Sequence, residues 1–90
     1  MNPKLELYKL LAAWIEAAPT LDEEGATPFR NEFNRLVVEA FGTPLLGDNP
    51  EGMLYDKTRN NLLQYSVDKN DIWLEGAKEN FEQIPKPAEN

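Results

Sequence analysis

Cysteine and histidine are both absent from this 90-residue sequence. The absence of cysteine excludes disulfides, so packing must hold the domain together, and it favours a reducing compartment such as the cytoplasm. The absence of histidine removes the side chain most often used for proton transfer near neutral pH and the commonest transition-metal ligand. Ser66, the only serine, therefore has no histidine to activate it as a nucleophile. We expect a cytoplasmic protein that is not an enzyme and that binds no cofactor or metal.

Long apolar runs and clusters of basic side chains are absent as well. The apolar segment 5–18 is interrupted by Glu6, Lys9 and Glu16, so it predicts neither a signal peptide nor a membrane-spanning helix. Nine lysines and arginines stand against sixteen aspartates and glutamates, which gives a net charge of −7 at pH 7. Phosphate backbones and anionic lipids are bound by basic clusters. We therefore expect neither a membrane nor a nucleic acid as a direct partner.

The length and the apolar content fit one domain with a single core. Ninety residues are too few to give two independent units enough buried surface each. Apolar residues make up 41% of the chain and include two tryptophans and four phenylalanines, which is enough for one core. We predict a single helical domain over residues 1–85. Pro85 and Pro87 should end its last helix and leave residues 86–90 as a disordered tail.

Three segments have apolar residues at helical spacing and recognisable helix ends. The first helix should begin at Asn2-Pro3, because asparagine caps a helix and proline suits its first position, and should end at Pro19. The second should begin at Thr27-Pro28 for the same reason and end at Gly42. Residues 20–26 would then form an acidic loop. The last helix should begin after a cap at Asn70 or Asp71 and end at Pro85.

Residues 53–69 can be interpreted in two ways. Leu54, Tyr55, Leu62 and Tyr65 share one face of a helical wheel, which favours a helix that could begin at Asn49-Pro50. Apolar and polar residues also alternate over 63–67 as in a strand, with 57–61 as the turn of a hairpin. We favour an all-α bundle of three or four helices. The alternative is an α+β fold with one β-hairpin near residues 53–67.

The charged residues suggest one candidate interaction surface. On the last predicted helix, Asp71, Glu75, Glu79 and Glu82 fall within about 80° of arc, opposite the apolar face. A second group of acids occupies the predicted loop and consists of Asp22, Glu23 and Glu24. Such a stripe is also what the solvated side of any amphipathic helix provides. We predict these seven residues as the binding site for a basic protein partner.

Two functions follow from this pattern. Grouped carboxylates steer association with a basic surface and can occupy a site built for phosphates. The first hypothesis is therefore a small acidic protein-binding module, such as an inhibitor, immunity or antitoxin-type protein, that docks on a basic macromolecular partner. The alternative is a structural subunit or assembly adaptor that associates through an apolar patch, including with its own copies as a homo-oligomer. Exposure of Leu5, Val38, Leu63 or Val67 would favour this alternative.

Overall fold

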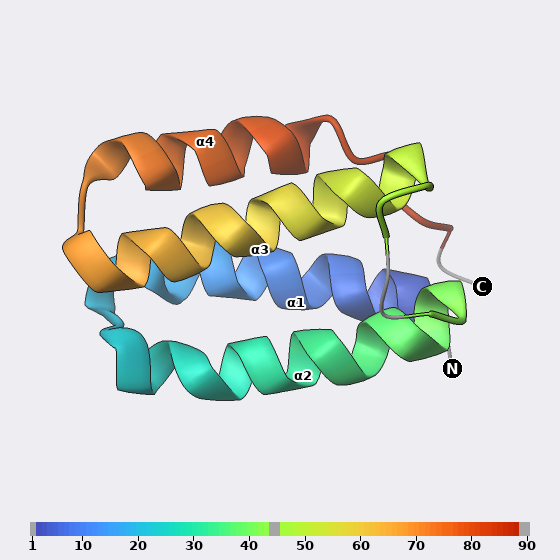
Figure 1. Ribbon diagram of the computed structural model, residues 1–90, viewed down its shortest axis with the longest axis horizontal. Coiled ribbons are helices and arrows are strands. Elements are labelled where there is room, and N and C mark those ends of the chain that lie inside the picture. Colours follow the sequence, from blue (N-terminus) through green and yellow to red (C-terminus); the bar gives the residue numbers. More distant parts are fainter. Residues whose placement is uncertain (1, 44–45, 89–90) are drawn as a thin grey trace.

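The computed structural model describes residues 2–43 and 46–88, and these form four α-helices, one short 3-10 helix and no strand (Figure 1). The all-α prediction is confirmed. The hairpin alternative for residues 53–67 is wrong, because this segment lies within one continuous helix. The elements are α1 (Pro3–Ala17), η1 (Ala18–Thr20), α2 (Glu23–Phe41), α3 (Pro50–Asp68) and α4 (Asp71–Glu82).

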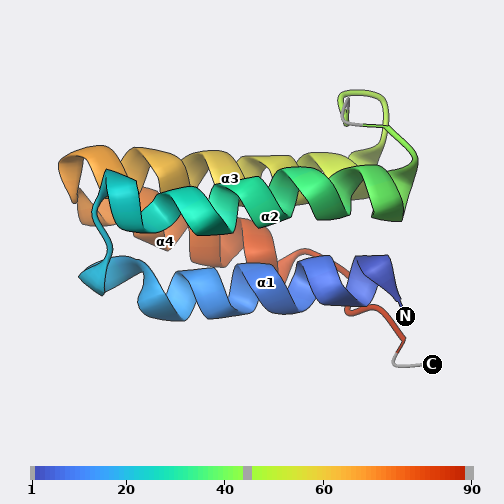
Figure 2. The same ribbon diagram turned by 90° about the horizontal axis from the view of Figure 1, so that it is seen from below.

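Consecutive helices run in opposite directions along the bundle (Figures 1 and 2). The α1–α2 and α3–α4 connections lie at one end, which we call the loop end. The α2–α3 connection and both ends of the chain lie at the other, which we call the termini end. Helix α1 packs against the other three helices, whereas α2 and α4 lie at opposite edges of the bundle in Figure 1. The outward face of α4 is therefore not covered by another helix.

Each helix begins at an asparagine or aspartate whose side chain accepts a backbone hydrogen bond. Such caps satisfy one of the amide groups that have no partner within the helix. They also explain why α1, α3 and α4 begin where the sequence predicts, with Asn70 rather than Asp71 as the cap of α4. The capping bonds are Leu5 N to Asn2 (3.2 Å), Gly25 N to Asp22 (2.7 Å), Gly52 N to Asn49 (2.9 Å) and Ile72 N to Asn70 (3.1 Å).

The predicted start of α2 at Thr27-Pro28 is wrong. The helix begins at Glu23, after the Asp22 cap, so most of the predicted acidic loop is helical. Negative side chains at Glu23 and Glu24 stabilise this first turn because they face the positive end of the helix dipole. Pro28 lies inside the helix, where it has no N–H to offer to the carbonyl four residues earlier. The cap and the acidic first turn outweigh the signal from the proline.

Two helices end in a left-handed residue. Gly42 follows α2 with φ of 76°, as the sequence predicts, because glycine adopts this conformation without a Cβ clash. Lys69 follows α3 with φ of 56°, which is uncommon for a residue with a side chain. Its ammonium donates hydrogen bonds to the carbonyl oxygens of Ala18, at 3.1 Å, and Leu21. These bonds tie the α3–α4 connection to the α1–α2 connection and close the loop end.

The core runs along the bundle axis and is built mainly from aromatic and aliphatic residues. Trp14 is buried, as expected, and stacks on Phe29 with ring centroids 5.6 Å apart. Leu5 is also buried, so it adds nothing to an apolar surface of the kind that the alternative function requires. The largest fully buried side chains are Trp14, Tyr55, Phe33, Leu7, Leu11, Leu62 and Thr58.

Two polar residues are buried on the core side of α3. The hydroxyl of Thr58 donates to the carbonyl of Leu54 at 2.7 Å, and that of Ser66 donates to the carbonyl of Leu63 at 2.6 Å. These local bonds satisfy both hydroxyls inside the helix, so neither needs water or another helix.

The segment after α4 lies against the start of α1 at the termini end. Ile84 is buried, and the side-chain amide of Asn2 donates to the carbonyl of Ala88 at 2.8 Å. The domain boundary at residue 85 and the disorder of residues 86–90 stay predictions. Residues 89 and 90 of that tail lie outside the described residues.

Candidate protein-docking face

Four carboxylates line the outward side of α4. Asp71, Glu75, Glu79 and Glu82 are all exposed, while Leu74 and Ala77 on the opposite side of the helix are buried. We call these four residues the acidic face. Carboxylates spaced four residues apart on a helix repel one another by about 0.2–0.5 kcal/mol per pair. Repulsion among these carboxylates therefore opposes the stability of α4 slightly.

Several acids outside the acidic face form ion pairs with basic side chains. Lys4 pairs with Glu51 at 3.0 Å, Arg35 pairs with Glu39 at 3.0 Å and with Glu32, and Arg59 pairs with Asp56. Within the described part of the chain, no residue of the acidic face has an ion pair. These carboxylates remain available to a partner.

One base lies beside the acidic face. Lys78 is exposed and stands three residues after Glu75 and four before Glu82, which places it on the neighbouring strip of the helix. It makes no ion pair with either residue in the part of the chain that is described. The position of Lys78 beside these carboxylates was not predicted from the sequence, although helical spacing alone places it there. The charge of this face is therefore predominantly but not purely negative.

The second predicted acidic group has a structural role at the start of α2. Asp22 is the cap, and its carboxylate accepts from the Gly25 amide at 2.7 Å, while Glu23 and Glu24 occupy the first turn. All three are exposed at the loop end. They share this end with Asp71, but α2 and α4 lie at opposite edges of the bundle (Figure 1). The structure does not join the two groups into one surface, and the binding role of all seven residues stays a prediction.

Asp68 organises the corner between α3 and α4, and sequence reasoning did not identify it. Its carboxylate accepts from the Asn70 amide at 3.0 Å, from the Gln64 side chain at 3.3 Å and from the Trp73 indole N–H at 3.0 Å. The backbone hydrogen bond from Asn70 is the main cause that lowers the pKa of Asp68, with help from Gln64 and Trp73. An aspartate two residues before the Asn70 cap is typical of an Asx turn. This pattern could have indicated the role of Asp68 from the sequence.

Exposed apolar side chains are few. Among the residues expected to reveal an apolar patch, Val38 and Val67 are exposed, at 45% and 58%, and Leu63 is half-buried. Ile72, at 62%, is the most exposed large apolar side chain in the described part of the molecule. It lies one position after Asp71 and three before Glu75, so it borders the acidic face. The sequence pattern did not predict this exposure.

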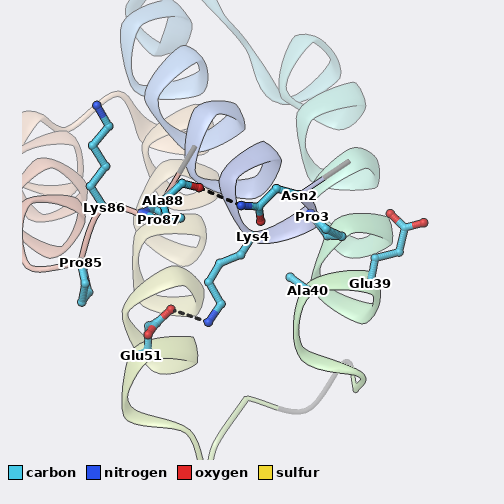
Figure 3. Close-up of a pocket in the computed structure, with 10 residues that line it drawn as sticks. All are labelled: Asn2, Pro3, Lys4, Glu39, Ala40, Glu51, Pro85, Lys86, Pro87 and Ala88. Carbon is cyan, nitrogen blue, oxygen red and sulfur yellow. Dashed lines mark hydrogen bonds and ion pairs between the residues drawn. The ribbon is translucent and has the colours of Figure 1, made fainter. Parts of the chain in front are cut away.

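A hollow of about 470 Å³ opens at the termini end (Figure 3). Lys4 spans it to pair with Glu51, and Lys4 also lies 5.2 Å from the centre of the Phe41 ring. The side chains of Glu39 and Lys86 extend away from its middle in Figure 3. Lys4 and Glu51 neutralise each other, so these two groups leave no unbalanced charge in the hollow. Its lining is Asn2, Pro3, Lys4, Glu39, Ala40, Glu51, Pro85, Lys86, Pro87 and Ala88.

Over residues 2–43 and 46–88, no helix combines the length and apolarity needed to cross a membrane. The same residues contain no group of three or more acidic side chains arranged to hold a metal ion.

Comparison with known proteins adds no relative. No protein family, curated protein or solved structure matches this chain.

Proposed function

We propose that the chain is a small protein-binding module whose acidic face docks on a basic protein surface. The observation that carries this proposal is the set of four exposed carboxylates on α4 that make no ion pair within the described chain. The module would act as inhibitor, immunity or antitoxin-type proteins act, by covering a basic functional surface of its partner. The lack of cysteine is consistent with action in the cytoplasm.

The physical basis is electrostatic complementarity. A surface with a concentrated negative charge attracts a basic partner over distances comparable to the Debye length, about 8–10 Å at moderate salt. This attraction accelerates encounter and fixes the orientation of the complex, and ions screen it. The interaction should therefore weaken steeply as the salt concentration rises.

Charge reversal tests the proposal with a matched control. The tagged protein would be used to capture partners from host lysate at low and high salt, with bound proteins identified by mass spectrometry. Glu75→Lys with Glu79→Lys should abolish capture of a basic partner seen at low salt. The control, Glu6→Lys with Glu16→Lys, alters two exposed acids of α1 and changes the net charge by the same amount. Equal loss in both double variants would overturn the proposal, because net charge alone would then explain binding.

A second candidate is an assembly subunit that associates through apolar contacts. The observation in its favour is the exposure of Val38 on α2 and Val67 on α3. Sedimentation velocity at high salt tests it, because apolar association is not screened by ions. Reversible self-association that Val67→Ser or Val38→Ser reduces would favour this candidate. A monomer at every concentration would argue against self-assembly.

A further inference from the structure

Ile72 occupies an unusual position for an aliphatic residue. It stands in the first turn of α4 with its side chain 62% exposed, and its backbone N–H donates to the Asn70 side chain at 3.1 Å. Most of this side chain gains nothing from burial within the bundle. Isoleucine is also a poorer helix former than alanine or leucine, because β-branching restricts its χ1 angle. Neither packing nor helix formation therefore accounts for an isoleucine here.

The surroundings of Ile72 combine charge with rigidity. Asp71 precedes it and Glu75 follows three residues later, so the apolar side chain lies at the edge of the acidic face. The corner beneath it is fixed by the three hydrogen bonds to Asp68 and by the bonds from Lys69 to the α1–α2 connection. A surface that is already ordered loses little conformational entropy when it binds. Apolar centres surrounded by polar groups are the usual form of a binding hot spot.

We infer that Ile72 is the apolar anchor of the acidic face and that its partner is a basic protein segment with exposed apolar side chains. Apolar side chains of that segment cover Ile72, and its lysines or arginines meet Asp71 and Glu75. The inference rests on the proposed function and names the chemistry of the partner. Charge complementarity selects this occupant, since a second copy of the chain would bring two acidic faces together. The acids govern encounter, whereas Ile72 governs how long the complex lasts.

Two synthetic helical peptides serve as probes. One is a labelled amphipathic peptide of lysine and leucine, and the other is the same peptide with every leucine replaced by alanine. Their affinities would be measured by fluorescence anisotropy for the wild-type protein, for Ile72→Ser and for the control Val38→Ser, which alters another exposed β-branched residue. The thermal midpoint of each variant, from circular dichroism, confirms that it folds.

Ile72→Ser should weaken binding of the lysine–leucine peptide about tenfold or more, as expected for loss of one buried aliphatic side chain. It should leave binding of the alanine peptide unchanged, and Val38→Ser should change neither. If Ile72→Ser binds both peptides as the wild type does, the anchor is refuted. Glu75→Lys with Glu79→Lys then decides separately on the proposed function, which this assay refutes if the double variant also binds both peptides as the wild type does. Self-association of the wild type that Ile72→Ser abolishes would overturn the inference in favour of a second copy.

Discussion

Replacing Tyr55 by phenylalanine should stabilise the protein. Tyr55 is completely buried, its ring packs edge-on against Phe41 at 5.6 Å, and its hydroxyl has no hydrogen-bond partner among the described residues. An unsatisfied buried hydroxyl costs about 1–3 kcal/mol. The substitution removes this group and keeps the ring, so we expect a gain of about 1 kcal/mol after the small void is considered. For a domain of this size, that gain raises the thermal midpoint by about 4–8 °C.

Thermal and urea unfolding followed by circular dichroism measure this effect. Tyr8→Phe is the control, because Tyr8 is half-buried against Phe81 with ring centroids 4.6 Å apart. We expect the control to change the free energy of unfolding by less than about 0.5 kcal/mol. A loss of stability in Tyr55→Phe would refute the reasoning, since it would mean that the hydroxyl makes a stabilising hydrogen bond.

Tyr55 also makes the stability of the protein depend on pH in the alkaline range. Burial is the main cause that raises the pKa of Tyr55 above its ordinary value of 10.0, and the nearby charge of Glu51 and the Tyr8 hydroxyl add to it. The folded state then holds the phenolic proton at a pH where the unfolded state has lost it. Stability from this group is complete below pH 10.0 and declines as the pH rises above it. Tyr55→Phe has no group that titrates here, so its stability should not decline in this way and its advantage over the wild type should grow above that pH.

Three further substitutions test the fold and the corner beside the acidic face. Pro28→Ala should stabilise the protein by about 1–3 kcal/mol in urea unfolding if α2 begins at Glu23, whereas no gain would place the start of the helix at the proline. Asn49→Ala should cost about 1 kcal/mol through loss of the α3 cap, and Asn49→Asp should restore it; equal stability of both variants would contradict the capping role. The lowered pKa of Asp68 means that its stabilisation is present above the ordinary value of 3.8 and is lost as pH falls through the folded value. Asp68→Asn should therefore flatten the decline of stability in acid, and an unchanged decline would show that other carboxylates cause it.

Three of the four helix starts could be predicted from the sequence because capping chemistry is local. Asn2, Asn49 and Asn70 each place a side-chain oxygen near an amide of the first turn, and this requires no tertiary contact. The start of α2 was missed because two local signals compete there. Proline is favoured at a first helical position, but Asp22, six residues before Pro28, caps the helix and the chain accepts the proline inside it.

Helix α3 was harder to predict for a different reason. Its core side includes Thr58 and Ser66, whose hydroxyls are satisfied by the carbonyls of Leu54 and Leu63 within the same helix. If every polar residue is assumed to be exposed, the apolar face of this segment is interrupted at Thr58 and Ser66. The pattern is then also compatible with a hairpin. Only the packing of the helix shows that these two residues are buried.

The candidate site was predictable in part. Helical spacing alone places Asp71, Glu75, Glu79 and Glu82 on one side of α4. The exposure of Ile72 depends on how α4 packs on its neighbours, so the sequence pattern could not give it. The ion pairs that occupy Arg35 and Arg59 with other acids likewise depend on folded geometry.

The most direct test of the central claim is the salt dependence of affinity for a captured basic partner. Binding constants would be measured over a range of salt concentrations for the wild type, for Glu75→Lys with Glu79→Lys, and for Glu6→Lys with Glu16→Lys. We predict a steep fall in wild-type affinity with salt, a much weaker salt dependence in the α4 variant, and a wild-type slope in the α1 variant. An affinity that is independent of salt, or a slope that both variants reduce equally, would contradict docking through the acidic face.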